Sequence, residues 1–151
     1  MDAFVQPLYE LADFDAIIRQ LKKPGIVQVS GCLDSQKAHF TNGLLREFPF
    51  RLIVAENDLK AKAFYEDFRL YDPEVLYYPA RDLIFYQADI HGNLLTRQRI
   101  QVLRALLERE EVTIVTSIDS CLDCLVPLAV WKEKVIKIRN DSEIDLDRMK
   151  R

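Results

Sequence analysis

The sequence predicts an α/β fold in which a parallel β-sheet is covered by helices on both faces. Short apolar runs of strand character recur at residues 26–30, 51–55, 75–79 and 112–116. Segments with helical spacing of their apolar side chains separate these runs, and proline, glycine and asparagine stand at the junctions. Strands that alternate with helices in this way usually run parallel, with the connecting helices packed on the two faces of the sheet.

The first third of the chain predicts a helix, a strand and a second helix. Apolar side chains recur at steps of three and four over residues 8–22, and the sequence Lys23-Pro24-Gly25 ends this helix. The strand at 26–30 enters a loop that begins with Gly31, and the second helix is predicted over 35–47. The side chains expected to face the core are Leu11, Phe14, Ile18 and Leu21 of the first helix and Phe40, Leu44 and Phe48 after the loop.

The middle of the chain continues the alternation. A buried strand is predicted at 51–55, and Asn57 is placed to cap a third helix that ends at Asp72-Pro73. A strand at 75–79, a long helix at 93–109 and a strand at 112–116 follow. The side chains expected to face inward are Leu59, Ala63, Phe64 and Phe68 of the third helix and Ile100, Leu103 and Leu107 of the long helix.

After Ser117 the pattern changes to a short helix, a proline break and a loose apolar segment. Residues 134–138 have strand character, and the final residues look like the first turn of a further helix. The sequence therefore predicts an α/β domain over 1–118. Residues 119–151 are expected to be a connection to a following domain of a larger protein.

Composition excludes several classes of protein. The chain has 151 residues, of which 49% are hydrophobic and 30% charged, and its net charge is −3. This balance is typical of a globular protein and lacks the basic excess of a dedicated nucleic-acid-binding module. No apolar run approaches the roughly 18 residues of a membrane span, and no secretory signal opens the chain. An odd number of cysteines, three, fits a reducing compartment, so we expect a cytoplasmic protein with no membrane contact.

The loop after the first predicted strand looks like a phosphate-binding loop that has lost most of its working residues. Gly31 and Lys37 fill the first glycine and the lysine of G-x-x-x-x-G-K-[ST], but Gln36 replaces the second glycine and Ala38 the hydroxyl residue. Glutamine restricts the backbone that would cradle a phosphate, and alanine offers magnesium no oxygen. Asp34 adds a repelling negative charge. The favoured interpretation is a structural turn that needs no cofactor, and the alternative is a nucleotide-binding domain with an atypical loop.

Two other motifs invite a functional interpretation. Glu56 lies where the ribose-binding acid of a dinucleotide fold would lie, but that fingerprint needs three glycines and this loop has one. Cys121 and Cys124 form a C-x-x-C pair, but no second pair of zinc ligands accompanies it. The other candidate ligands, Cys32, His39 and His91, are scattered along the sequence. We expect the cysteine pair to be buried in the core and to bind no metal.

The long helix carries several arginines. Arg97 and Arg104 lie two turns apart on one side of it, and Arg104 can pair with Glu108 at the i,i+4 spacing. A solvated helix face is the expected role, in preference to contact with nucleic acid. Neither histidine has a partnering acid and nucleophile, so no catalytic site is predicted.

Residues 77–122, with the segments "PARDLIFY", "RQRIQVLRALL" and "VTIVTSIDSCL", resemble the N-terminal region of the bacterial transcription-repair coupling factors (Mfd). In that family this region is similar to UvrB, the damage-recognition subunit of nucleotide excision repair, and its phosphate-binding loop is degenerate, as "GCLDSQKA" is here. The resemblance implies a UvrB-like, helicase-like half-domain with a degenerate P-loop. The tyrosine-rich DNA-gripping hairpin of UvrB has no room between Tyr78 and Asn93.

What the resemblance implies about function is a non-catalytic module that helps to recruit UvrA to stalled RNA polymerase. The ATP- and Mg-dependent DNA translocase, and the contacts with polymerase and DNA, would belong to other domains of the parent protein. Most of the UvrA surface would belong to the inserted domain that follows, so no UvrA-contact residue is assigned here. The uncompleted sheet also predicts self-association through residues 126–151, at 134–138 or around Leu128–Trp131.

Overall fold

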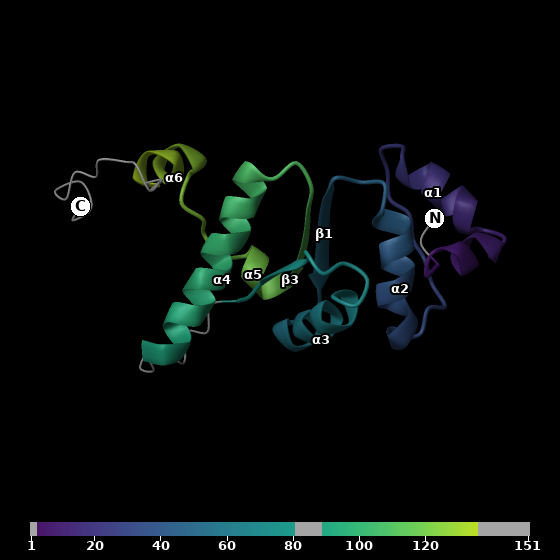
Figure 1. The fold of residues 1–151 in the computed structure, drawn as a ribbon, viewed down its shortest axis with the longest axis horizontal. Helices are drawn as coiled ribbons and strands as arrows, with labels where there is room; N and C mark the ends of the chain where they lie inside the picture. The colour runs from purple at the N-terminus through teal and green to yellow at the C-terminus, as the bar shows by residue number, and fades with distance from the viewer. Residues whose placement is uncertain (1–2, 81–88, 136–151) are drawn as a thin grey trace.

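The computed structural model describes residues 3–80 and 89–135 of the chain. Three layers follow one another along its longest dimension: N-terminal helices, a small sheet with one helix on each face, and a C-terminal segment (Figure 1). Within the described residues, none of the helices has the length and apolar character that crossing a membrane requires.

The sheet is parallel and has three strands among the described residues. The strands are β1 (Phe50–Ala55), β2 (Leu76–Tyr78) and β3 (Val112–Ser117), in the order β1-β3-β2. Phe50 of β1 lies opposite Val112 of β3, and Leu76 of β2 lies opposite Ile114. β3 is buried along its whole length because it is the central strand. The predicted α/β class with a parallel sheet is confirmed, as are the strands at 51–55, 75–79 and 112–116.

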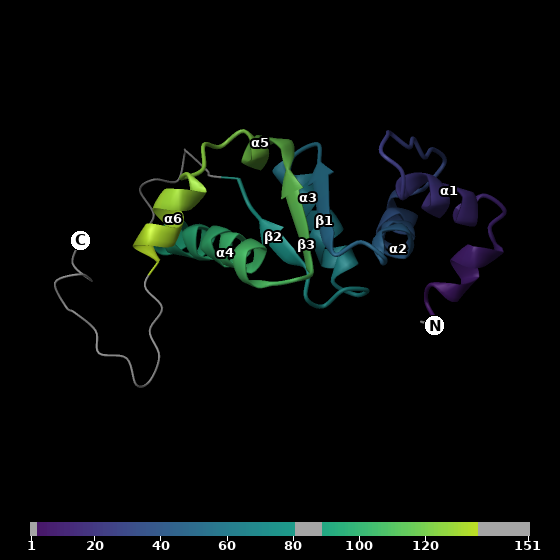
Figure 2. The same cartoon turned by 90° about the horizontal axis from the view of Figure 1, so that it is seen from above.

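Helices cover opposite faces of this sheet. On one face α3 (Asp58–Phe68) buries Ala61 and Phe68 against Val115 of β3. On the other face α4 (Asp89–Glu108) buries Val102 and Ala105 in a second cluster, formed by Leu76, Tyr78, Val102, Ala105, Val112 and Ile114. Neighbouring residues of β2 and β3 thus point to different layers, as the pleat of a strand requires. In Figure 2, α4 lies to one side of the strands and α3 is largely hidden behind them.

The N-terminal layer contains the 3₁₀ helix η1 (Gln6–Glu10), α1 (Phe14–Leu21) and α2 (Asp34–Leu45). A single helix over 8–22 is therefore wrong, because Leu11 takes an extended conformation and separates η1 from α1. The predicted helix at 35–47 is confirmed as α2. Gly43 of α2 faces Leu8 and Phe14 so closely that a Cβ atom would lie 2.4 Å from the tip of Leu8. The glycine lets the two N-terminal segments approach α2.

The predicted strand at 26–30 is wrong. This segment lies outside the sheet, and its Ile26 is 99% exposed. Strand formation needs a neighbour for backbone hydrogen bonds, and the segment connects α1 to α2, which pack on each other at one side of the molecule. The turn at Gly25 and the positive φ of Gly31, +90°, direct the chain between these helices.

Four expectations about burial are also wrong, and the first concerns Leu11, which the sequence predicts to face the core and which is 51% exposed. In α3, Leu59 is 81% exposed and Ala63 is exposed, while Phe64 and Phe68 do pack inward. The face of α4 on the sheet carries Val102 and Ala105, and not the predicted stripe, which is Ile100, Leu103 and Leu107. β1, expected to be buried, alternates between exposed and half-buried side chains because no helix covers one of its faces.

The last described residues form two short helices, α5 (Ile118–Cys121) and α6 (Leu128–Lys134). Ser117 caps α5, since its hydroxyl accepts a hydrogen bond from the amide of Ser120. The apolar segment after the proline break is thus helical and not loose, with Pro127 at the start of α6. The predicted strand at 134–138 and the final helical turn lie outside the described residues, apart from Lys134 and Val135.

Candidate functional site

Two charged side chains in the loop at residues 31–38 form an ion pair with each other. The ammonium of Lys37 lies 2.6 Å from the carboxylate of Asp34, one helical turn earlier. This hydrogen bond and the positive charge lower the pKa of the Asp34 carboxyl below its usual value. The lysine that would meet a phosphate in a working loop is therefore already engaged by a carboxylate at the start of α2.

The other two altered positions have structural roles. The Gln36 side chain accepts a hydrogen bond from the amide of Leu33 at 3.2 Å and so occupies a donor at the start of α2. Ala38 is 2% exposed and packs in the cluster with Ala61 and Phe68. Its side chain points into the core between α2 and α3, so the position that would hold a magnesium-binding hydroxyl is a packing position here.

Polar side chains gather at the carboxyl edge of the sheet, where α/β proteins commonly bind ligands. One carboxylate oxygen of Asp58, in the first turn of α3, accepts hydrogen bonds from the amide of Ala80 at 3.2 Å and from the hydroxyl of Ser117 at 3.3 Å. The Ser117 and Ser120 hydroxyls lie 2.9 Å apart. Burial, followed by a hydrogen bond to Asp58 and its charge, raises the pKa of Tyr77.

This cluster cannot carry out nucleophilic catalysis as it stands. Ser117 and Ser120 are 0% and 2% exposed, so no substrate reaches their hydroxyls. A serine nucleophile also needs a general base near neutral pH. His39, the histidine whose side chain the structure describes, instead stacks on Tyr71 and forms a hydrogen bond with the carbonyl of Phe4. What the cluster does is fasten the ends of β2 and β3 to the start of α3.

A buried arginine joins this edge to the C-terminal segment. Arg99 of α4 is 5% exposed, and its Nη1 donates to the carbonyl of Pro79 at 2.8 Å and lies 2.9 Å from the carboxylate of Asp123. Its guanidinium carbon lies 4.2 Å from the centre of the Tyr78 ring. Arg99 therefore connects the end of β2, the helix α4 and the link between α5 and α6.

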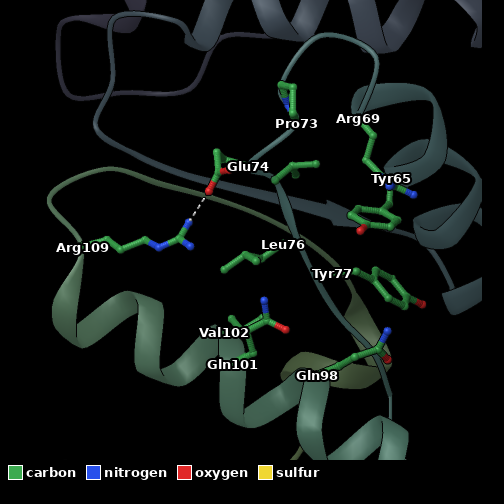
Figure 3. Close-up of a pocket in the computed structure, with 11 residues that line it drawn as sticks. Tyr65, Arg69, Pro73, Glu74, Leu76, Tyr77, Gln98, Gln101, Val102 and Arg109 are labelled. Carbon is green, nitrogen blue, oxygen red and sulfur yellow. Dashed lines mark hydrogen bonds and ion pairs between the residues drawn. The ribbon is translucent and has the colours of Figure 1, made fainter. Parts of the chain in front are cut away.

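A shallow hollow of about 250 Å³ follows the outer edge of β2, between α3 and α4 (Figure 3). The rings of Tyr65 and Tyr77, tilted by 31° with their centres 5.3 Å apart, form one side, and Gln98 and Gln101 of α4 form the other. Its charged residues are paired: Arg109 with Glu74 at 3.2 Å, and Arg69 with Glu66 at 3.2 Å. The described lining of this hollow therefore presents no unpaired charge that would select a charged ligand.

Two curated proteins from two strains of Staphylococcus epidermidis match this chain, and both are described as transcription-repair-coupling factor. Each is 25% identical to it over 124 residues, which is 80% of this chain and 11% of the relative. The chain is related in sequence to transcription-repair-coupling factors. It spans about a tenth of the length of the curated relatives it matches. No protein-family model and no solved structure matches it.

In this relative of the transcription-repair-coupling factors, the remaining predicted residues lie apart. Cys121 and Cys124 are both exposed, so their predicted burial is wrong; α5 ends at Cys121 and the chain emerges to the surface. In the described part of the chain no three His, Cys, Asp or Glu residues are placed to hold a metal ion. Glu56 pairs with Lys60 after β1, and the side chain of His91 lies outside the described residues.

The arginine prediction is confirmed in part. Arg104 pairs with Glu108 at 2.7 Å on the exposed side of α4, and Arg97 is exposed. Sequence reasoning missed Arg99. A signal existed, because Arg99, Val102 and Ala105 follow one another at helical spacing, and this places the arginine on the same side of α4 as two small core residues.

Proposed function

We propose that this chain is a non-catalytic module of a transcription-repair coupling factor. In this proposal it mimics UvrB and helps to recruit UvrA to stalled RNA polymerase. The parent protein is an ATP-dependent DNA translocase in the cytoplasm, and its other domains contact DNA and polymerase. The chain itself needs no ATP or magnesium.

The observation that carries the proposal is the state of the loop at residues 31–38. Lys37 is engaged by Asp34, and Ala38 is packed between α2 and α3. The buried Ala38 joins α2 to the core beside α3, so this position supports the fold, which is what an interaction module needs. The sequence relation to transcription-repair-coupling factors supplies the biological setting.

The alternative, nucleotide binding by an atypical loop, receives little support from the geometry. A phosphate-binding loop connects a strand of the sheet to a helix, so that the strand fixes the position of the backbone amides. Here the residues before the loop, 26–30, are not part of the sheet. No observation in the described part of the chain favours this function over that of a scaffold.

The test is UvrA capture by three immobilised proteins: this chain, a version extended through the following domain, and the parent protein with residues 1–118 deleted. We expect strong capture by the extended version and weak capture by this chain alone. Deletion of residues 1–118 is expected to weaken capture by the parent while leaving its DNA-stimulated ATPase rate unchanged. Full UvrA capture by the deleted parent would contradict the proposal, and strong capture by this chain alone would place the recruiting surface on its own sheet.

A further inference from the structure

The two cysteines of the C-x-x-C pair both lie on the surface. Cys121 is the last residue of α5, and Cys124 follows three residues later in the link to α6; both are exposed free thiols. The third cysteine, Cys32, is half-buried in the loop before α2. Exposed thiols are open to oxidation, whereas buried structural cysteines are inert, and a second thiol nearby directs oxidation toward a disulfide.

The chain turns between these two cysteines. Leu122 has helical backbone angles, φ −79° and ψ −11°, and its amide donates to the carbonyl of Asp119 at 3.3 Å. The chain bends again at Asp123. Residues three apart lie on the same side of a helical turn, and such a turn brings their Cα atoms within the separation of about 4.4–6.8 Å that a disulfide needs. The backbone between Cys121 and Cys124 therefore suits a bond between their sulfur atoms.

Asp123, between the two cysteines, attaches this turn to the rest of the molecule. Residues 122–127 are exposed apart from Asp123, whose carboxylate lies 2.9 Å from Nη1 of Arg99. Arg99 is itself held in place, because it donates to the carbonyl of Pro79 and lies over the Tyr78 ring. Successive side chains of a helical turn point about 100° apart, so the cysteines turn away from an inward-facing Asp123, in agreement with their exposure.

We propose that Cys121 and Cys124 form a reversible disulfide that restrains the link between α5 and α6, and that the Arg99–Asp123 pair favours its formation. The ring that this bond closes contains Asp123, so the bond and the ion pair restrain the same turn. Each restraint lowers the conformational entropy that the other must remove, and this coupling is reciprocal. Oxidation therefore adds a covalent restraint where the chain leaves the sheet.

The oxidant is a low-molecular-weight disulfide such as glutathione disulfide. One protein thiolate attacks a sulfur of the small disulfide, which gives a mixed disulfide and releases one small thiolate. The second protein thiolate attacks the protein sulfur of the mixed disulfide and releases the other small thiolate. Two protein thiols are thus oxidised to one disulfide, the small disulfide is reduced to two thiols, and the two protons pass to the released thiolates. In a reducing compartment such protein disulfides are transient and act as redox sensors.

Equilibration of the purified chain in glutathione buffers of increasing oxidised fraction tests the bond. After the free thiols are alkylated, mass spectrometry should find an intrachain bond between Cys121 and Cys124, while Cys32 carries the alkyl group. In the Cys121→Ser control, Cys124 should form no more than a mixed disulfide with glutathione. Failure of the two thiols to pair in any of these buffers would overturn the proposal, as would pairing of either one with Cys32.

Two substitutions test the coupling to the ion pair. Asp123→Asn and Arg99→Met each remove one charge of the pair, and each should lower the equilibrium constant for disulfide formation by about fivefold, at the low end of coupling between linked sites. A direct effect of charge on the thiols predicts opposite shifts, because loss of a carboxylate favours the thiolates and loss of a guanidinium disfavours them.

The matched control is Arg104→Met, because Arg104 pairs with Glu108 on the exposed side of α4. It should leave the equilibrium constant unchanged. Circular dichroism shows whether each variant is folded, and Asp123→Asn alone decides the outcome if Arg99→Met is not. Unchanged constants, or shifts of opposite sign in the two variants, would overturn the role of the ion pair.

Discussion

Replacing Arg99 with methionine should destabilise the fold substantially. The Arg99 side chain is 6% exposed, and it pairs at 2.9 Å with Asp123, which is 29% exposed. Methionine keeps the apolar stem and removes the charge. The variant loses a charged hydrogen bond to the carbonyl of Pro79, of about 1.5–3 kcal/mol, and a contact with the Tyr78 ring of up to about 2 kcal/mol.

Two features reduce this loss. The Asp123 side chain is 29% exposed, although the Oδ2 atom that faces Arg99 is itself buried. Water can reach part of this carboxylate once the arginine is gone, so the cost stays below the roughly 3–5 kcal/mol of a fully buried broken pair. The second terminal nitrogen of Arg99, Nη2, is buried with no hydrogen-bond partner among the described residues, so part of its desolvation is not offset now. We therefore expect Arg99→Met to lower the free energy of unfolding by about 2–3 kcal/mol. For a chain of this length that lowers Tm by about 5–10 °C.

Urea and thermal unfolding followed by circular dichroism measure this loss. The matched control is Arg104→Met on the same helix, because its side chain is 72% exposed and its pairing with Glu108 is worth less than about 1 kcal/mol. Asp123→Asn should lower the free energy of unfolding by part of the same amount. The double variant should lower it by less than the sum of the two single changes. An Arg99→Met protein as stable as the Arg104→Met protein would refute the account of the buried arginine.

Three further predictions follow from single contacts. Asn57→Ala should cost about 1 kcal/mol in urea unfolding, because the Asn57 side chain caps α3 through the amide of Lys60 at 2.9 Å; an unchanged midpoint would contradict the cap. Because the pKa of Tyr77 is raised, the folded state keeps the Tyr77 proton to a higher pH than the unfolded state does. The free energy of unfolding should therefore fall as pH rises above about 10, and Tyr77→Phe should make that fall smaller. Metal analysis should find no stoichiometric zinc, and a chelator should leave Tm unchanged although Cys121 and Cys124 are exposed; one zinc per chain would overturn this.

The elements that sequence reasoning predicts well are those with strong local signals. β3 is a continuous β-branched run, and Asn57 caps α3 as predicted. The segment 26–30 has equally good strand character, but a strand also needs a neighbour, and pairing depends on residues distant in the sequence. Its tie to α1 and α2 outweighs its local preference.

The orientation of α4 shows a second limit. Periodicity identifies Ile100, Leu103 and Leu107 as an apolar stripe, and that stripe exists, but it faces outward. The side on the sheet includes Arg99, which a hydrophobicity pattern assigns to solvent. Among the described residues, the Tyr78 ring, the Pro79 carbonyl and Asp123 make burial of that arginine acceptable.

At the candidate site, the structure places Asp34 in contact with Lys37, whereas the sequence predicts only that the charge of Asp34 repels a phosphate. It does not predict that Ala38 is a core residue between α2 and α3. The difference is physical, because a pair three residues apart on a helix is local, whereas burial of one methyl group depends on where the next helix packs.

The measurement that tests the central claim most directly is the melting temperature of the chain with and without millimolar Mg-ATP. The claim is that the loop at residues 31–38 holds the fold together and binds no nucleotide. Ligand at 100 times its dissociation constant would stabilise the fold by about 2.7 kcal/mol and raise Tm by several degrees. We predict no shift, and also none after Gln36→Gly combined with Ala38→Thr, because the negative charge of Asp34 remains and the residues before the loop, 26–30, are not a strand that fixes its backbone amides. A rise of several degrees in the wild-type chain would contradict the account and identify a nucleotide-binding domain.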